Sequence, residues 1–411
     1  MSINTITLDE FKEICNYLLD NNKRLVDEGK NPTAVGVIGS AGLGKTSVIQ
    51  QIAESRGMTF VKLNLSELEE VSDLTGFPIK EYKLRVRNTE GKFEDTWVAH
   101  DLLDLYLRSA CEDFELTDQV RMSYATPAWL PREENENGTI LLLDDYTRAN
   151  SLFQQAIMEL ICTGKYISWK LPKYTSVLLS SNPDDGAYQV SSLDAAQMSR
   201  LVNFPIKFDI KAWSRWAENA KLDTRAINFG LMYSNEIFEQ ENNQTINPRS
   251  YTTFCNAISG LKDWSETKTL AMILNIAKGC FDDKDNVVGH LFTMFIANKL
   301  DKLISPEDLL NKDWATVSQE VKKCVYDEHG NYRPDIASVL STRLLNYTSW
   351  YFEQSGSKSD PVQKRLLEFI DSPEMLFSED LFYNVIKQLA TNYPSRMNKV
   401  ILNPKIRKKL I

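Results

Sequence analysis

Short apolar runs alternate with helical or loop segments over the first half of the chain. Runs rich in Val, Ile, Leu and Phe lie at 34–38, 59–63, 139–143, 175–180 and 202–208. Because parallel strands need crossover connections, this alternation predicts an α/β layer with a mostly parallel sheet. From Ala212 onward the strand pattern ends and the periodicity becomes helical. Helices are expected there at 212–220, 224–239, 248–259, 266–277, 286–303, 306–321, 336–352, 360–370 and 380–389.

A long insertion separates the second and third apolar runs, from about 77 to 138. Its first part alternates apolar and charged residues over 82–87, passes through Asn88-Thr-Glu-Gly91, and resumes alternation over 92–97. This pattern predicts a β-hairpin. A helix is expected to follow at 101–111.

A length of 411 residues exceeds what one compact core accommodates, so several domains are expected. The N-terminal helix occupies 1–30 and opens with a capping box at Thr7 and Glu10. An α/β domain spans 31–210 and carries the insertion. A helical lid then spans 211–262, and an all-helical C-terminal domain spans 263–411.

The segment Gly39–Thr46 reads Gly-Ser-Ala-Gly-Leu-Gly-Lys-Thr and matches the phosphate-binding pattern GxxxxGK[ST]. A strand pattern precedes it and a helical pattern follows, which is the context that this loop requires. Its backbone N–H groups and the helix N-terminus suit the β- and γ-phosphates of a nucleoside triphosphate. Lys45 is expected to pair with phosphate oxygens and Thr46 to ligate Mg²⁺. A glycine-rich turn that contains lysine by chance is the weaker alternative in this context.

The nucleotide-binding residues expected from this match are Gly39, Ser40, Ala41, Gly42, Leu43, Gly44, Lys45, Thr46 and Ser47.

Polar side chains follow two later apolar runs. The run Ile140-Leu-Leu-Leu ends in Asp144 and Asp145, and Ser176-Val-Leu-Leu-Ser-Ser ends in Asn182. A phosphoryl-transfer site needs one acid near Mg²⁺ and a second group that orients the attacking water. Asp144 suits the metal and Asp145 the water, while Asn182 can share the water or the γ-phosphate. A buried strand with two solvated turn acids is the alternative.

Two arginines complete the predicted constellation. Arg200 ends the segment Ser192-Leu-Asp-Ala-Ala-Gln-Met-Ser-Arg200, and Arg249 lies in Asn247-Pro-Arg-Ser-Tyr251 at a predicted helix start. Together they suggest a charge clamp on the γ-phosphate, with one arginine supplied in trans and the other in cis.

The order of these motifs over about 31–260 resembles a MoxR-like AAA+ ATPase, particularly the phage and bacterial members. Asp73-Leu-Thr-Gly76-Phe-Pro and Pro127-Ala-Trp129-Leu-Pro131 also resemble that group. The resemblance implies an AAA+ P-loop core with a parallel sheet, a helical lid and a helical C-terminal region. It also implies a hexameric ring that uses ATP and Mg²⁺ to remodel a protein client.

The same resemblance implies roles for individual residues. Lys45 and Thr46 would be Walker A, Asp144 and Asp145 Walker B, Asn182 sensor 1, Arg200 the arginine finger, and Arg249 sensor 2. A partner with a von Willebrand factor A domain is implied by resemblance only. The family usually ends Walker B in Asp-Glu, whereas this chain has Asp-Asp. The shorter acid predicts slow hydrolysis.

Three other functions compete with this interpretation. A nucleotide-gated scaffold with little turnover is compatible with the Asp-Asp ending. A nucleic-acid translocase could use Lys83, Arg85, Arg87 and Lys92 of the insertion, although a solvated hairpin face explains them better. A GTPase is suggested by Asp73-Leu-Thr-Gly76 and Asn298-Lys-Leu-Asp301. The second of these motifs falls in a predicted helix rather than at a strand end, so GTP is disfavoured.

Composition narrows the class further. A formal net charge of −9 argues against a generic nucleic-acid coat protein, although nucleic-acid binding stays possible. No apolar stretch approaches bilayer length and no signal-peptide pattern opens the chain, so no membrane association is expected. Six scattered cysteines without a CxxC pair predict reduced thiols and a cytoplasmic location, in the host cytoplasm if the chain is phage-encoded.

Overall fold

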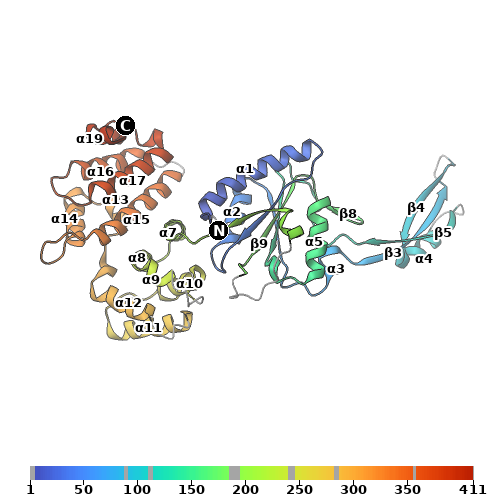
Figure 1. The fold of residues 1–411 in the computed structure, drawn as a ribbon, viewed down its shortest axis with the longest axis horizontal. Helices are drawn as coiled ribbons and strands as arrows, with labels where there is room; N and C mark the ends of the chain where they lie inside the picture. The colour runs from blue at the N-terminus through green and yellow to red at the C-terminus, as the bar shows by residue number, and fades with distance from the viewer. Residues whose placement is uncertain are drawn as a thin grey trace. The chain divides into compact units, whose positions relative to one another are not determined.

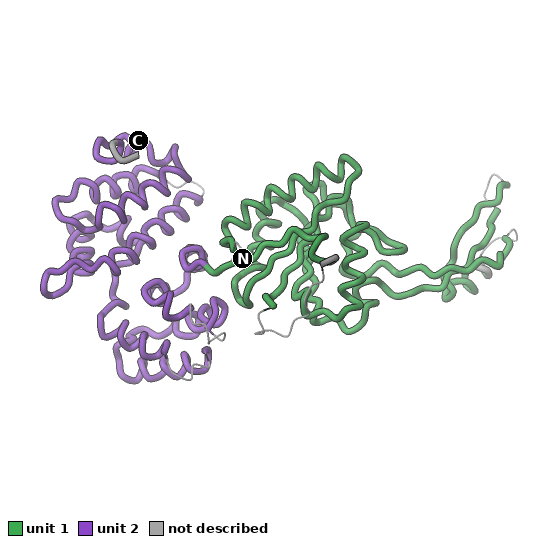
Figure 2. The backbone as a smooth tube through the Cα atoms, in the orientation of Figure 1, with its two compact units in different colours: residues 1–208 green, residues 209–411 purple. Residues whose placement is uncertain are grey.

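The chain forms two compact units, residues 1–208 and residues 209–411 (Figure 2). The structure, a computed structural model, describes residues 5–87, 91–109, 114–184, 195–238, 246–281, 287–354 and 358–410. The expected domain boundaries at 30, 210 and 262 stay predictions.

The first unit is built on a five-stranded parallel sheet (Figure 1). Its strands are β1 (Ala34–Ile38), β2 (Thr59–Asn64), β6 (Thr139–Asp144), β9 (Thr175–Ser181) and β10 (Leu201–Pro205). The spatial order is β10-β1-β9-β6-β2, so the strand before the phosphate loop lies inside the sheet. The expected parallel sheet that carries the phosphate loop, followed by a helical region, is confirmed.

The last strand departs from the expected 202–208. Its ladder with β1 ends at Pro205; the Ile206 amide still donates to the Ile38 carbonyl at 2.7 Å, and the chain then also pairs with the N-terminal segment. Ile206 forms a bridge with Ile6, and the Lys207 amide donates to the Ile6 carbonyl at 3.0 Å.

Helices cover both faces of this sheet. Alternation along β6 sends Ile140 and Leu142 to one face and Leu141 and Leu143 to the other. Helices α1 (Leu8–Asp27) and α2 (Lys45–Ser55) pack on the first face, and α5 (Ser151–Thr163) packs on the second. The Thr7–Glu10 capping box is present at the start of α1. Strands covered on both sides explain the continuous apolar runs in the sequence.

The insertion forms a separate three-stranded antiparallel sheet with one helix, here called the arm (Figure 1). It comprises β3 (Pro78–Arg87), β4 (Phe93–Ala99), α4 (His100–Ser109) and β5 (Phe114–Tyr124), in the strand order β4-β3-β5. The predicted hairpin is confirmed, although residues 88–90 at its turn lie outside the described residues. The predicted helix begins at His100 and is described as far as Ser109. Strand β5 was not predicted.

The root of the arm depends on Gly76, which follows the short helix α3 (Val71–Thr75). Gly76 adopts φ 87° and ψ 161°, and a Cβ there would lie 1.7 Å from the Ala125 carbonyl oxygen. The indole N–H groups of Trp129 and Trp169 donate to the carbonyls of Leu74 and Thr75, at 3.1 Å and 2.8 Å. The two chain segments that lead into and out of the arm are therefore held closely together.

The described part of the second unit is helical, as expected. Its longer helices are α7 (Ile210–Asn219), α8 (Thr224–Met232), α10 (Pro248–Ile258), α11 (Thr267–Phe281), α12 (Val287–Ala297), α14 (Trp314–Val325), α15 (Pro334–Glu353), α16 (Ser359–Asp371) and α17 (Glu379–Asn392).

Two predicted helices of this unit are each divided into two α-helices. The helix expected at 224–239 breaks at Tyr233, and a short helix α9 (Ser234–Phe238) follows. The helix expected at 306–321 divides into α13 (Pro306–Asn311) and α14, because the Asp313 carboxylate caps a new N-terminus by accepting from the Thr316 amide.

A buried ionic cluster joins α7, α8 and α15. The Arg343 side chain is fully buried; it bonds Glu218 at 2.7 Å and donates to the Asn228 side-chain oxygen at 2.9 Å. Among the described residues, no helix combines the length and apolar character that crossing a bilayer requires.

Candidate nucleotide-binding site

The phosphate loop connects the carboxyl end of β1 to the start of α2. Gly42 and Gly44 have φ of 80° and 93°, in the left-handed region that glycine adopts without strain. Gly44 is the N-cap of α2, so the first helical amides are directed at the loop. This backbone has the form of an anion cradle at a helix N-terminus.

Lys45 lies inside this cradle and is only 8% exposed. Its ammonium donates to the carbonyls of Gly39 at 2.5 Å and Ser40 at 3.0 Å, and to the Asn182 side-chain oxygen at 3.4 Å. Lys45 thus links the loop to the tip of β9. A buried ammonium held by neutral oxygens is well placed for an anionic ligand.

Asp144 at the end of β6 faces the same loop. Its Oδ2 accepts from the Thr46 hydroxyl at 3.1 Å and pairs with the Lys62 ammonium at 2.9 Å, and its Oδ1 accepts from the Ser180 hydroxyl. Burial alone would raise the pKa of Asp144, but these hydrogen bonds and the Lys62 charge outweigh it and hold that pKa below its ordinary value. The carboxylate is therefore ionised at neutral pH.

The oxygens of Thr46 and Asp144 fit a magnesium site. Mg²⁺ prefers hard oxygen ligands and usually takes only one or two groups from the protein, together with water and phosphate. A hydroxyl and an ionised carboxylate in mutual hydrogen-bond contact supply that set.

Asp145 has an unusual backbone conformation, with φ 56° and ψ 37°. A non-glycine residue in the left-handed region is uncommon, and such residues gather at functional sites. The Asp145 carboxylate accepts from the Asn182 side-chain amide at 3.5 Å and lies 4.0 Å from the Arg148 guanidinium. The two acids predicted at the strand end therefore have different partners.

Arg200 lies at the amino ends of the strands, whereas the loop lies at their carboxyl ends. Strand β10 runs parallel to β1, with Leu201 beside Ala34 and Pro205 beside Ile38. Arg200 therefore precedes the amino end of its strand, whereas the loop follows the carboxyl end of β1. The strand length separates them by roughly 16 Å. The Arg200 guanidinium donates to the Cys162 sulfur at 3.1 Å.

Arg249 belongs to the second unit. It is exposed in the first turn of α10, whose N-cap Asn247 accepts from the Arg249 and Ser250 amides. The structure thus brings Lys45, Thr46, Asp144, Asp145 and Asn182 together, and places Arg200 apart from them within the first unit.

Two residues at this site were not predicted from the sequence. Ser180 lies two residues before Asn182, so strand alternation directs both side chains to the same face. Lys62 interrupts the apolar strand β2. A charged residue within an apolar strand is the sequence feature that could have identified Lys62 as a site residue.

The residues of the GTPase patterns are not arranged as guanine nucleotide motifs. Asp73 lies in helix α3 rather than at the end of an apolar strand. The helix expected at 286–303 ends at Ala297, so Asn298 and Lys299 lie in a turn, with Lys299 at φ 56°. That turn belongs to the helical unit.

No protein-family model and no curated protein matches the chain in sequence. Among solved structures, it is similar to the RuvB Holliday junction branch migration motor of Thermotoga maritima, with 14% identity, coverage of 80% of this chain and 89% of that chain, and a TM-score of 0.33. A mutant of the same RuvB matches with 11% identity, 80% and 95% coverage, and a TM-score of 0.36.

A protein of Cytophaga hutchinsonii assigned as an ATPase is 14% identical, with 87% of this chain and 80% of that chain covered and a TM-score of 0.30. Similarity at this level carries no functional conclusion. The fold assignment rests on the strand order and the phosphate loop.

Proposed function

We propose that the chain is an AAA+ ATPase that hydrolyses ATP with Mg²⁺ and works as a ring, a hexamer by resemblance, to remodel a protein complex. The observation that supports this proposal is the convergence of the phosphate loop with three strand-end residues, Asp144, Asp145 and Asn182, at one edge of the sheet. A purely structural loop would need neither a buried lysine bonded to Asn182 nor a threonine bonded to Asp144.

Each residue at this edge has a chemical role in the proposal. The loop amides and Lys45 bind the phosphates, and Thr46 and Asp144 would hold Mg²⁺, which would supply positive charge to neutralise the developing negative charge. Asp145 orients the attacking water, and Asn182 positions Asp145 and the γ-phosphate. Arg249 is assigned the sensor 2 role by the resemblance alone.

The position of Arg200 supports a ring. Because Arg200 lies at the amino ends of the strands, away from its own phosphate loop, it is better placed to serve the site of a neighbouring subunit. Composite sites of this kind form in closed rings with head-to-tail interfaces. A trans arginine contributes about 10³- to 10⁵-fold to turnover in other phosphoryl-transfer enzymes.

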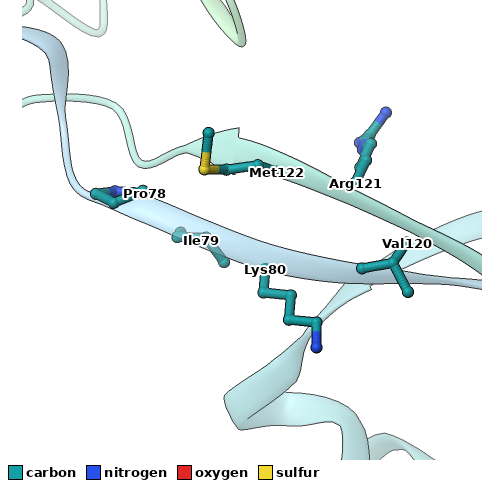
Figure 3. Close-up of a pocket in the computed structure, with 6 residues that line it drawn as sticks. All are labelled: Pro78, Ile79, Lys80, Val120, Arg121 and Met122. Carbon is teal, nitrogen blue, oxygen red and sulfur yellow. The ribbon is translucent and has the colours of Figure 1, made fainter.

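The arm supports a protein client. Leu116, Val120 and Met122 of β5 are exposed large apolar residues. Val120 and Met122 line an open pocket with Pro78, Ile79, Lys80 and Arg121 (Figure 3). Clustered exposed apolar side chains are typical of protein interaction sites.

The charges of the arm argue against a nucleic-acid translocase. Lys83 pairs with Asp95 at 2.7 Å, and Arg121 pairs with Glu81 at 2.6 Å. Arg121 also covers the Trp97 ring, at 4.3 Å from its centroid. Lys83 and Arg121 are therefore compensated within the arm, and Arg121 covers the face of Trp97, one of the two rings, with Tyr82, that could stack on bases. A von Willebrand factor A domain partner and a cytoplasmic location remain proposals that rest on the resemblance and the composition.

The proposal is tested by steady-state hydrolysis of ATP and GTP across a protein concentration series, with Lys45→Ala as the inactive variant. Lys165→Ala, which removes an exposed lysine from the first unit, is the matched control. ATP turnover per subunit that rises with concentration and disappears only in Lys45→Ala supports a ring enzyme. Tight ATP binding without turnover would instead favour the nucleotide-gated scaffold, and preference for GTP would overturn the assignment of ATP.

A further inference from the structure

Lys62 is a charged residue in the middle of strand β2. In the sheet register it lies beside Leu142, and Asn64 lies beside Asp144. Its side chain extends along the strand to the acid at the end of β6, and its ammonium lies 2.9 Å from Asp144 Oδ2.

The same carboxylate oxygen accepts the hydrogen bond from the Thr46 hydroxyl, at 3.1 Å. Thr46 and Asp144 are the two residues expected to hold Mg²⁺. The Lys62 charge is thus directed at the side of Asp144 that a divalent ion would use. Like charges this close repel, so the ammonium and the metal compete for one carboxylate.

The exposure of the pair allows such an exchange. The Lys62 side chain is 41% exposed, whereas that of Asp144 is 15% exposed. The ammonium can therefore move into water when it leaves the carboxylate, whereas the carboxylate needs a cation or hydrogen-bond donors where it lies.

We propose that Lys62 is a positioning residue that neutralises Asp144 until Mg²⁺ arrives, and thereby weakens the coupling between Mg²⁺ and nucleotide binding. This inference rests on the proposed nucleotide site. It adds Lys62, a residue outside the sequence motifs, and assigns to it control over how strongly nucleotide affinity depends on Mg²⁺. Because the protein supplies only two ligands, Mg²⁺ binds together with the nucleotide phosphates. A cation displaced in that step lowers the metal affinity of the nucleotide-bound site, and it lowers by the same factor the gain in nucleotide affinity that the metal provides.

The test measures binding of a fluorescent, non-hydrolysable ATP analogue in excess Mg²⁺ and in EDTA. The ratio of the two affinities reports the coupling. Lys62→Met removes the charge and keeps most of the side-chain length, and we expect its ratio to exceed that of the wild type by about two- to fivefold, the range of a partly exposed ion pair. Lys62→Arg keeps the charge and should keep the wild-type ratio.

Lys83→Met is the matched control, because Lys83 also pairs with an aspartate across neighbouring strands, at 2.7 Å from Asp95. Its ratio should equal that of the wild type. A ratio that is unchanged or reduced in Lys62→Met overturns the proposal, because Lys62 then acts only on the fold or on the nucleotide. Lys62→Gln provides the same comparison if the methionine variant does not fold.

Failure of the underlying function has a different signature. If the wild type binds no analogue in either condition, or if Lys45→Ala binds it equally well, the nucleotide site itself is refuted. A change in the coupling ratio confined to Lys62→Met and Lys62→Gln supports the inference specifically.

Discussion

At the scale of single residues, Asp145 offers a direct test of chemistry at the site. Its backbone is left-handed, a conformation in which Asn is as acceptable as Asp. Asp145→Asn therefore removes the negative charge without disturbing the strand end. We expect turnover of ATP to fall about 10²- to 10⁴-fold, the usual contribution of a positioned base. Analogue binding should stay near the wild-type value.

Asp145→Glu is the matched comparison. It keeps the charge, lengthens the side chain by one methylene and creates the Asp-Glu ending of the MoxR-like proteins. Measured by the same phosphate-release assay, it should keep turnover or raise it. Full activity in Asp145→Asn would assign the attacking water to another group.

At the scale of elements, the root of the arm depends on one glycine. Gly76→Ala places a Cβ within 1.7 Å of the Ala125 carbonyl oxygen, in a φ/ψ region that is essentially restricted to glycine. The two chain segments at the root must then separate. We expect the free energy of unfolding, measured by urea denaturation, to fall by about 3 kcal/mol.

Gly164→Ala isolates the steric contribution. Gly164 also has a positive φ, 66°, but no atom lies within 4 Å of the added Cβ. Its substitution should cost about 1 to 2 kcal/mol, the backbone contribution alone. Equal losses in the two variants would show that close packing at Gly76 contributes nothing.

The second prediction at this scale concerns the buried ion pair between Arg343 and Glu218 in the helical unit. Arg343→Met leaves the Glu218 carboxylate, which is 10% exposed, without its partner. Breaking a buried pair in this way lowers the free energy of unfolding by about 3 to 5 kcal/mol. The double variant Arg343→Met/Glu218→Gln should recover part of that loss in urea denaturation.

Lys322→Met is the surface control, because Lys322 pairs with Glu374 at 2.7 Å with both side chains about half exposed. It should change stability by less than about 1 kcal/mol. A loss in Arg343→Met no larger than this would mean that the cluster does not tie α7, α8 and α15 together.

Residue spacing and hydrophobic periodicity predicted the elements that can be recognised from a short stretch of sequence alone. The phosphate loop, the ends of β6 and β9, and the helical unit followed from spacing and periodicity. Strand β5 was missed although apolar residues alternate along it at 114, 116, 120, 122 and 124; Asp118 interrupts the alternation, and the place of the strand in the sheet depends on pairing with β3. Lys62 and Arg343 were missed for a related reason: each is defined by a partner on another element. Sequence spacing does not reveal which distant side chains meet.

At the scale of the whole molecule, the separation of Arg200 from its own phosphate loop makes a prediction about assembly. If each site uses the arginine of a neighbour, Arg200→Ala and Lys45→Ala subunits fail for different reasons. The first lacks the arginine that it should donate, and the second lacks the lysine that it should use. Each pure variant is expected to be nearly inactive, with a loss of about 10³- to 10⁵-fold for Arg200→Ala.

Mixing the two variants should restore activity. An Arg200→Ala subunit keeps an intact phosphate loop, and a neighbouring Lys45→Ala subunit supplies an intact Arg200. Random mixing in equal amounts makes about one quarter of the interfaces complete in a head-to-tail ring. Phosphate release by the mixture should therefore exceed the sum of the separate variants by a wide margin. If the mixture shows only that sum, Arg200 does not act between subunits, and the ring loses its main structural support.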